Sequence, residues 1–367
     1  MKAGFSPVLH CIIIKGNNIG LACLDTFKKS LAKVDTINMG LGGPGSWIST
    51  GNYALNRSLS GNFKKGIPLG RITLFAGPSG SGKSFISSNC MKKAQDEGFH
   101  LLILDSENAI DTEYLQKIGV DTSEEKLTYF QVTTIEDVNK ICSDFCGSYI
   151  KTYGKNKTDS PPVLIVIDSL AMLSTTTEFE NYGKDGTIKS DQGIRAKRNK
   201  SMLRMLIGQI ARLPMAVICT DHVYPQDIML GDGAWAITNS TKFSSSIIGL
   251  VTKLKLKDES EVIGVRMRFE TYKSRFAKLG TKIELEVPYS SGMSPFSGLV
   301  DMLMDMGVLV KDGHSVRCDF ADGTSLKFKP KDINEEICER LFTHHLANPV
   351  EMSEDVADTE EADATET

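Results

Sequence analysis

A glycine-rich segment carries the clearest chemistry in the sequence. It fits the pattern G-x-x-x-x-G-K-[S/T] and reads Gly77-Pro78-Ser79-Gly80-Ser81-Gly82-Lys83-Ser84. The glycines let the backbone curl so that several N–H groups point into one concavity, and a helix that starts there adds the positive end of its dipole. Lys83 can reach the β- and γ-phosphates of ATP, and the Ser84 hydroxyl can ligate Mg²⁺. The segment therefore predicts a site for ATP and Mg²⁺.

Two apolar runs elsewhere in the chain end in the carboxylates that such a site needs. The run 163–167 is followed by Asp168, which we expect to hold Mg²⁺ through water from the carboxyl end of a buried strand. The run 101–104 is followed by Asp105 and then by Glu107. Hydrolysis requires a group that positions or activates the attacking water, and Glu107 is the better placed candidate. The residues alone leave open the alternative that both acids only cap a turn.

The elements around these residues alternate between strand and helix. Short apolar runs predict strands at 72–75, 101–104, 163–167 and 215–219, and helical stretches fall at 83–97 and 195–212. This alternation predicts an α/β fold with a mostly parallel central sheet flanked by helices.

The later part of the chain has a different pattern. Strands at 250–256, 264–271 and 282–287 follow one another with little helix between them, which predicts an antiparallel extension of the sheet. A hairpin across Asp322-Gly323 is expected within 314–329, and a short helix over roughly 332–345 closes the folded part.

Composition limits the class of protein. The chain has 367 residues, of which 41% are hydrophobic and 24% charged, so it is neither wholly disordered nor fibrous. No apolar run approaches the ~20 residues that span a bilayer, and the N-terminus does not resemble a signal peptide. The eight cysteines are irregularly spaced, and Cys142 and Cys146 suit one face of a helix. We expect reduced thiols and a cytoplasmic location, with no membrane partner.

Charge is unevenly distributed along the chain. Residues 351–367 hold eight acids and neither Lys nor Arg, which leaves residues 1–350 with 42 basic and 38 acidic residues. A mildly basic body with an acidic tail is found in nucleic-acid-binding proteins, and also in proteins with a merely solvated tail. We expect this tail to be disordered.

The domain organisation follows from these patterns. We expect an N-terminal arm and linker at 1–47, an ATPase core at 48–300, a small C-terminal subdomain at 301–349 and the disordered tail at 350–367. Within the arm, 24–34 has the spacing of an amphipathic helix. That helix could pack on its own domain or dock on a neighbouring subunit as an oligomerisation helix.

Several short motifs, taken in order, resemble the RecA family of recombinases, and most closely its UvsX branch from T4-like phages. The resemblance runs from about Ile48 to Asp301, and the motifs are specific through their order and spacing. Besides the glycine-rich segment, they are Ile48-Ser-Thr-Gly, Leu69-Gly-Arg-Ile-Thr, Asp105-Ser-Glu-Asn-Ala-Ile-Asp-Thr-Glu-Tyr114, 163–173, Lys273-Ser-Arg275, Tyr289-Ser-Ser-Gly292 and 296–301.

The resemblance implies roles for residues around the nucleotide. Glu107 matches the glutamate that polarises the attacking water. Asp111 and Tyr114 match residues around the adenine, with Tyr114 stacking on the base. His222 stands where many family members carry a glutamine that senses the γ-phosphate, and this departure is typical of the phage branch.

The resemblance also implies a site shared between subunits. Lys273 and Arg275 match a basic pair that reaches the γ-phosphate across a subunit interface, where a cation stabilises transition-state charge. Tyr289 and Gly292 match residues that close the adenine side from an adjacent subunit. Without the resemblance, a solvated strand face would be the better interpretation of the basic pair.

Two segments resemble the DNA-binding loops of the family. The first lies within 174–201, where the glycine-containing start 181–187 argues against a rigid element, and its candidate contacts are Lys184, Lys189, Arg195, Lys197, Arg198 and Lys200. The second follows His222, and its candidate residues for wedging between bases are Ile228, Met229, Leu230 and Trp235. A solvated basic helix and a lid or oligomer contact are the respective alternatives.

Together the resemblance implies an ATP-dependent DNA recombinase. Such a protein forms a homo-oligomeric helical filament on single-stranded DNA, pairs it with homologous duplex DNA and exchanges strands in recombination and repair. Mediator and single-strand-binding proteins are the expected further partners, in the host cytoplasm if a phage encodes the chain. A ring-forming helicase of the same fold and a non-catalytic filament accessory protein are the alternatives.

Overall fold

The computed structural model describes residues 26–29, 43–154, 160–185, 192–225, 235–237, 239–258, 261–290 and 292–347. The chain divides into two compact units, 1–43 and 44–367. Of the first unit, residues 26–29 are helical, and the remainder of the expected helix at 24–34 lies outside the described residues, as does the acidic tail. The paragraphs below concern the second unit.

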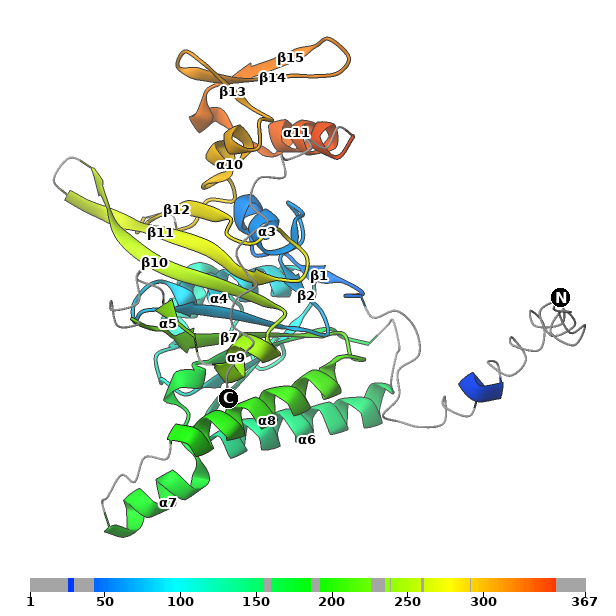
Figure 1. Ribbon diagram of the computed structural model, residues 1–367, viewed down its shortest axis with the longest axis vertical. Coiled ribbons are helices and arrows are strands. Elements are labelled where there is room, and N and C mark those ends of the chain that lie inside the picture. The colour runs from blue at the N-terminus through cyan, green and yellow to red at the C-terminus, as the bar shows by residue number, and fades with distance from the viewer. Residues whose placement is uncertain are drawn as a thin grey trace, which may run out of the picture. The chain divides into compact units, whose positions relative to one another are not determined.

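An eight-stranded sheet forms the centre of this unit (Figure 1). Its order is β12-β11-β10-β3-β7-β6-β4-β5. The six strands from β10 to β5 are parallel, and β11 runs antiparallel to both of its neighbours, β10 and β12. The strands are β3 Ile72–Gly77, β4 His100–Asp105, β5 Leu127–Gln131, β6 Val163–Asp168, β7 Met215–His222, β10 Ile247–Asp258, β11 Glu261–Ser274 and β12 Lys282–Pro288. The α/β class, the mostly parallel sheet and its antiparallel extension are confirmed.

Helices cover both faces of the sheet. The long helices α6 and α8 lie side by side on one face (Figure 1). The described helices are α3 Tyr53–Ser60, α4 Lys83–Asp96, α5 Thr112–Ile118, α6 Ile135–Tyr153, α7 Thr176–Asp185, α8 Gln192–Ile210, α9 Asn239–Ser244, α10 Leu299–Asp305 and α11 Glu335–Ala347. Cys142 and Cys146 are both buried on α6, as their spacing predicted. In the described part of the chain, no helix has the length and apolarity needed to cross a bilayer.

The central strands are buried on both faces, which explains why their sequences are continuous apolar runs. In β3, Phe75 packs into one core with Ile86 of α4, whereas Leu74 packs into a second core with Val138 of α6 and Leu203 of α8. All five side chains are fully buried. Because successive side chains point to opposite faces, a strand covered on both sides exposes none of its central side chains to solvent.

The smaller elements complete the unit. The expected hairpin forms from β14 Ser315–Asp319 and β15 Ser325–Phe328, with Gly323 in the left-handed region at φ 83°, and β13 Val310–Asp312 extends it to three strands. The remaining pieces are β1 Trp47–Ile48, β2 Ile67–Pro68, β8 Tyr224–Pro225, β9 Trp235–Ala236 and the 3₁₀ turns Leu170–Met172 and Pro330–Asp332. The division of 48–349 into a core and a subdomain stays a prediction.

The first segment that resembles a DNA-binding loop is helical on both sides of a gap in the described residues. The expectation that its glycine-containing start is not rigid is wrong for 181–185, which belong to α7, whereas the helix predicted at 195–212 is confirmed by α8; residues 186–191 lie outside the described residues. In α8, Met202, Leu203 and Leu206 are buried against the sheet and stabilise the helix that carries the basic residues. The glycine at 183 is tolerated inside α7 because a glycine in a helix costs only ~1 kcal/mol.

Candidate nucleotide-binding site

The glycine-rich segment connects the end of β3 to the start of α4. Gly80 and Gly82 have φ values of 65° and 105°, in the left-handed region that favours glycine. A Cβ atom on Gly77 would lie 2.2 Å from the carbonyl oxygen of Val251 in β10. The segment can therefore follow this path only with glycine at these positions, and it delivers Lys83 to the first turn of α4.

Lys83 lies inside the turn. Its Nζ donates to the carbonyl oxygens of Gly77 and Pro78, at 2.9 Å each. Burial lowers the pKa of Lys83, and the carboxylates of Glu107 and Asp168 are the main charges that oppose this change. An ammonium group is thus held at the point where a helix N-terminus and backbone N–H groups favour an anion.

Asp168 ends β6 next to Ser84. The carboxylate is buried and accepts from the Thr220 hydroxyl of β7. Burial raises the pKa of Asp168, and hydrogen bonds from Thr220 and Ser84 oppose the rise. Mg²⁺ in phosphate sites is typically held by one or two protein oxygens together with the substrate's phosphates, so the Ser84 hydroxyl and the Asp168 carboxylate fit this cation. Sequence reasoning missed Thr220, whose only signal is its position at the end of the adjacent strand.

Glu107 and His222 meet above the same edge of the sheet. The register pairs Asp105 with Asp168 and Gly77 with His222, and because Ile167 pairs with Cys219, these strand ends lie within about two residues of one another along the sheet. His222 Nε2 lies 3.1 Å from Glu107 Oε1, and their side chains are 20% and 28% exposed. The predicted water-positioning carboxylate and the predicted sensor are therefore in direct contact and remain accessible.

Asp221 fixes the backbone beside His222. Its carboxylate accepts from the backbone N–H of His222 at 2.9 Å and from the Thr241 hydroxyl of α9 at 3.3 Å. Burial raises the pKa of Asp221 to about 6, and these two hydrogen bonds oppose the rise. The end of β7 is thus tied to α9, which the sequence did not indicate.

The residues that were predicted to surround the adenine lie in two places. Asp111 caps the N-terminus of α5 by accepting from the backbone N–H of Tyr114 at 2.7 Å. Tyr114 is half-buried beside Ser88 of α4, and burial raises its pKa. Tyr289, which is 70% exposed, and Gly292 follow β12, three strands away from β3 in the sheet. The structure brings the first pair, but not the second, next to the helix that follows the glycine-rich turn.

Lys273 and Arg275 lie toward the other end of the sheet. Ile248 of β10 pairs with Lys273 on one side and with Leu74 on the other, so Lys273 is level with the middle of β3 and Arg275 lies toward its start. Lys273 Nζ donates to the backbone carbonyl of Lys242 at 2.7 Å, and Arg275 is exposed. Burial lowers the pKa of Lys273, and the nearby cations of Arg275 and Lys242 lower it further.

The predicted DNA contacts are only partly described. Arg195, Lys197, Arg198 and Lys200 lie on α8, where Arg198 Nε is 3.8 Å from Glu136 Oε1. The backbone of Lys184 belongs to α7 and that of Trp235 to β9, which pairs with β8. Lys189, Ile228, Met229 and Leu230 lie outside the described residues. These four basic candidates therefore lie on a helix, and their contact with DNA stays a prediction.

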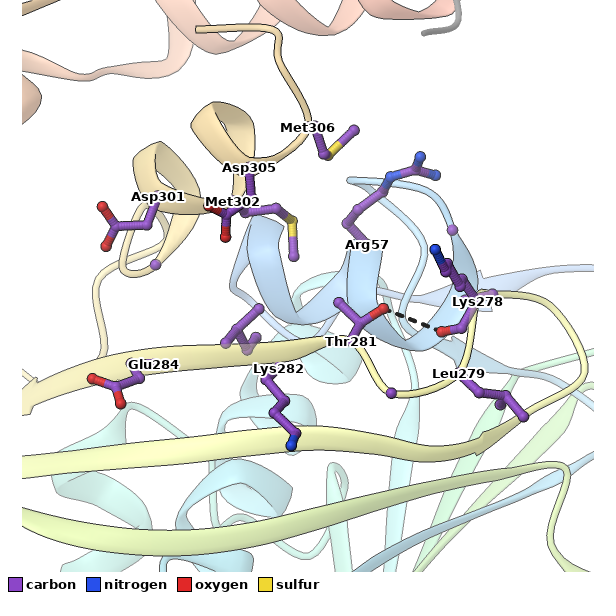
Figure 2. Close-up of a pocket in the computed structure, with 15 residues that line it drawn as sticks. Arg57, Lys278, Leu279, Thr281, Lys282, Glu284, Asp301, Met302, Asp305 and Met306 are labelled. Atoms are coloured by element: carbon purple, nitrogen blue, oxygen red, sulfur yellow. Dashed lines mark hydrogen bonds between the residues drawn. The ribbon is translucent and has the colours of Figure 1, made fainter. Parts of the chain in front are cut away.

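A separate cavity of about 510 Å³ lies between α3, the β11–β12 turn and α10. Figure 2 shows Asp301 and Asp305 of α10 on one side of it and Arg57 of α3 on the other. None of the residues assigned above to the nucleotide or to DNA lines this cavity. It therefore belongs to a different part of the surface.

Comparisons with known proteins agree with this geometry. The model of the RecA N-terminal domain matches residues 35–294. The chain is 28% identical over 268 residues to Protein RecA of Ruegeria pomeroyi, which covers 72% of each chain. It is 29% identical to Protein RecA of Chlorobium chlorochromatii, covering 79% of this chain and 78% of the relative. It is 28% identical to Protein RecA of Cutibacterium acnes, covering 84% and 86%.

Proposed function

Because the chain belongs to the RecA N-terminal domain family, we propose that it is a DNA-dependent ATPase that forms helical filaments on single-stranded DNA and catalyses homologous pairing and strand exchange. Its similarity to Protein RecA of three bacteria, over about three quarters of the chain or more, supports a recombinase over other proteins of this fold.

The observation that carries this proposal is the convergence of four side chains at adjacent strand ends. Lys83 and Glu107 follow β3 and β4, while Asp168 and His222 are the last residues of β6 and β7. These four strands are neighbours in the sheet. Lys83 would neutralise the β/γ-phosphates, and Glu107 would orient the attacking water. Bound Mg²⁺ would neutralise charge that develops on the phosphate oxygens, and Ser84 and Asp168 would hold it.

His222 is placed to couple hydrolysis to DNA binding. Its ring contacts Glu107, while its backbone is tied through Asp221 to α9, and the second proposed DNA loop lies between β7 and α9. A change in the contact between His222 and the γ-phosphate would therefore reach both ends of that loop. A histidine at this position also supports placing the chain in the UvsX branch of the family.

The position of Lys273 and Arg275 supports a site completed by a second subunit. The glycine-rich turn follows the carboxyl end of β3. Lys273 is level with the middle of β3 and Arg275 lies toward its start, and both are two strands away. At ~3.3 Å per residue along a strand, neither side chain extends to the phosphate site of its own subunit. We place ATP between protomers, with these cations supplied by the neighbour and DNA bound along the filament by α8 and the loop after β7.

The test combines electron microscopy with ATPase assays, each with and without single-stranded DNA. Helical filaments together with DNA-stimulated hydrolysis are expected. Closed rings would favour a helicase, and nucleotide binding without turnover would favour a non-catalytic accessory protein. Pairing with homologous duplex, and its dependence on added mediator or single-strand-binding proteins, is then measured by strand exchange, with an unrelated duplex as the control.

A Glu107→Gln variant tests the site itself. It retains the size and hydrogen-bonding capacity of the side chain but removes the carboxylate that would orient water. ATP binding and filament formation should persist, while turnover falls by about 100-fold or more. Hydrolysis at a rate near that of the wild type would show that Glu107 does not act on the water.

A further inference from the structure

The carboxylate of Asp105 organises the turn that carries Glu107. Oδ1 accepts from the backbone N–H groups of Glu107 and Asn108 at 2.8 Å each. Oδ2 accepts from the N–H groups of Ala109 and Ile110 at 3.1 Å each. The Tyr129 hydroxyl of β5 donates a fifth hydrogen bond to Oδ2 at 3.1 Å.

Asp105 is fully buried, so these bonds are formed away from water. Hydrogen bonds to a buried charged group are strong, and losing the charge leaves several N–H groups without an acceptor. The turn contains Asn108 at φ 53°, the one non-glycine residue with positive φ in the described part of the chain. The bonds to Asp105 hold a conformation that the backbone would otherwise leave.

Ser106 fastens the same turn to the end of β6. Its backbone N–H donates to the carbonyl oxygen of Asp168 at 2.8 Å. Its hydroxyl donates to the carbonyl oxygen of Ser169 at 2.6 Å and accepts from the backbone N–H of Ser169 at 2.9 Å. Hydrogen bonds to the Asp105 carboxylate therefore hold the backbone of the turn, and Ser106 attaches the turn to the end of β6. The Glu107 side chain extends from this turn to His222.

We propose that Asp105 is a positioning residue for ATP hydrolysis, acting only through Glu107. The inference rests on the proposed role of Glu107 and deepens it. Asp105 holds the turn so that the Glu107 carboxylate points at the phosphate site. Ser106 fixes the distance between that turn and the end of β6, where the proposed Mg²⁺ ligand Asp168 lies. Misplacement of a catalytic group by about 1 Å is enough to lower a rate by about 100-fold.

A double-mutant cycle in the full-length protein tests this role. Asp105→Asn places an NH₂ group where N–H donors converge, so kcat of the DNA-stimulated ATPase should fall by about 100-fold, with KM for ATP changed less than about threefold. In a Glu107→Gln background the same substitution should reduce the residual rate less than about twofold, because the group on which Asp105 acts is already absent. Equal fold losses in both backgrounds, or a loss confined to KM, would overturn the proposal.

Two further variants separate positioning from stability. Asp137→Asn is the matched control, because Asp137 accepts from the backbone N–H and hydroxyl of Thr134 at the start of α6, away from the site. It should leave kcat unchanged. Tyr129→Phe removes only the fifth bond to Asp105 and should lower kcat by about three- to tenfold in the wild-type background and not in the Glu107→Gln background.

The Tyr129→Phe cycle decides the question if Asp105→Asn does not fold. An unchanged kcat for Tyr129→Phe would then overturn the proposal. Failure of the proposed function has a different signature, which is wild-type turnover by Glu107→Gln alone.

Discussion

The two ends of the central sheet handle charge in opposite ways. At the carboxyl end, Lys83 and Asp168 are buried and hydrogen-bonded, and Lys83 lies near the carboxylates of Glu107, Asp168 and Asp221. Toward the other end, Lys273 meets a backbone carbonyl and the like charges of Arg275 and Lys242. The first arrangement sets a cation among carboxylates, whereas the second brings like-charged side chains together.

The difference suggests how one fold can be active only when it assembles. In the proposed function, the carboxyl end binds nucleotide and the basic end of a neighbouring subunit supplies charge. Within one subunit, Lys273 is level with the middle of β3 and lies two strands away from it. Stacking the basic end of one copy on the carboxyl end of the next would join them.

Lys83→Ala should abolish nucleotide binding as well as hydrolysis, because it removes the cation beside the β- and γ-phosphates and leaves neighbouring carboxylates unopposed. We expect turnover to fall by about 1,000-fold or more. Binding of a fluorescent ATP analogue by the isolated subunit is the measurement. Retained binding would mean that the carboxyl end is not the nucleotide site.

Lys273→Ala and Arg275→Ala should leave nucleotide binding by the isolated subunit intact and lower DNA-stimulated ATPase by about 100-fold. Lys278→Ala, an exposed lysine in the following turn, is the control and should change neither quantity. An equal loss of nucleotide affinity in Lys83→Ala and Lys273→Ala would contradict the division between the two ends.

Mixing two inactive variants tests whether the site is shared between subunits. Lys273→Ala protomers combined with Glu107→Gln protomers should recover part of the activity, because each defect lies on a different side of a shared site. ATPase is measured across mixing ratios with single-stranded DNA present. A rate that never exceeds the sum of the two separate variants would count against a shared site.

Asp221→Asn should alter how stability depends on pH. Burial raises the pKa of Asp221 from 3.8 in the unfolded chain to about 6 in the folded protein. The folded state therefore binds the proton more tightly, and the wild type loses free energy of unfolding relative to the variant as pH rises from about 4 to 6. The full difference is about 3 kcal/mol. Urea denaturation of both proteins at pH 4, 5, 6 and 7 measures it, and a pH-independent difference would refute the assignment.

Deletion of 351–367 should have the smallest effect. Its eight negative charges would compete with DNA phosphates for basic side chains, so truncation should strengthen binding to duplex DNA by a few fold at low salt, with less effect as salt rises. Basal ATPase should not change. Duplex affinity across a salt series is the measurement, and superimposable curves would leave the tail with no role in DNA binding.

Patterns in the sequence predicted the α/β architecture and much of the candidate nucleotide-binding site at the carboxyl end of the sheet. Continuous apolar runs predicted the buried parallel strands, and the glycine-rich turn, Asp168 and Glu107 were placed at strand ends because the carboxyl ends of parallel strands share an edge. Local pattern suffices there, since each residue's position follows from the strand that precedes it. The adenine, interface and DNA assignments came from the family resemblance and stay predictions.

Only the tertiary structure decided which side chains meet. The sequence left open whether Asp105 and Glu107 cap a turn, and the structure divides these roles: Asp105 caps it, and Glu107 reaches His222, 115 residues away. It also showed that residues 181–185 of the glycine-containing segment are helical, and that buried apolar residues at 202–206 anchor α8 to the sheet. Contacts between distant residues and burial against a sheet depend on the packing of several elements at once, and no local spacing records them.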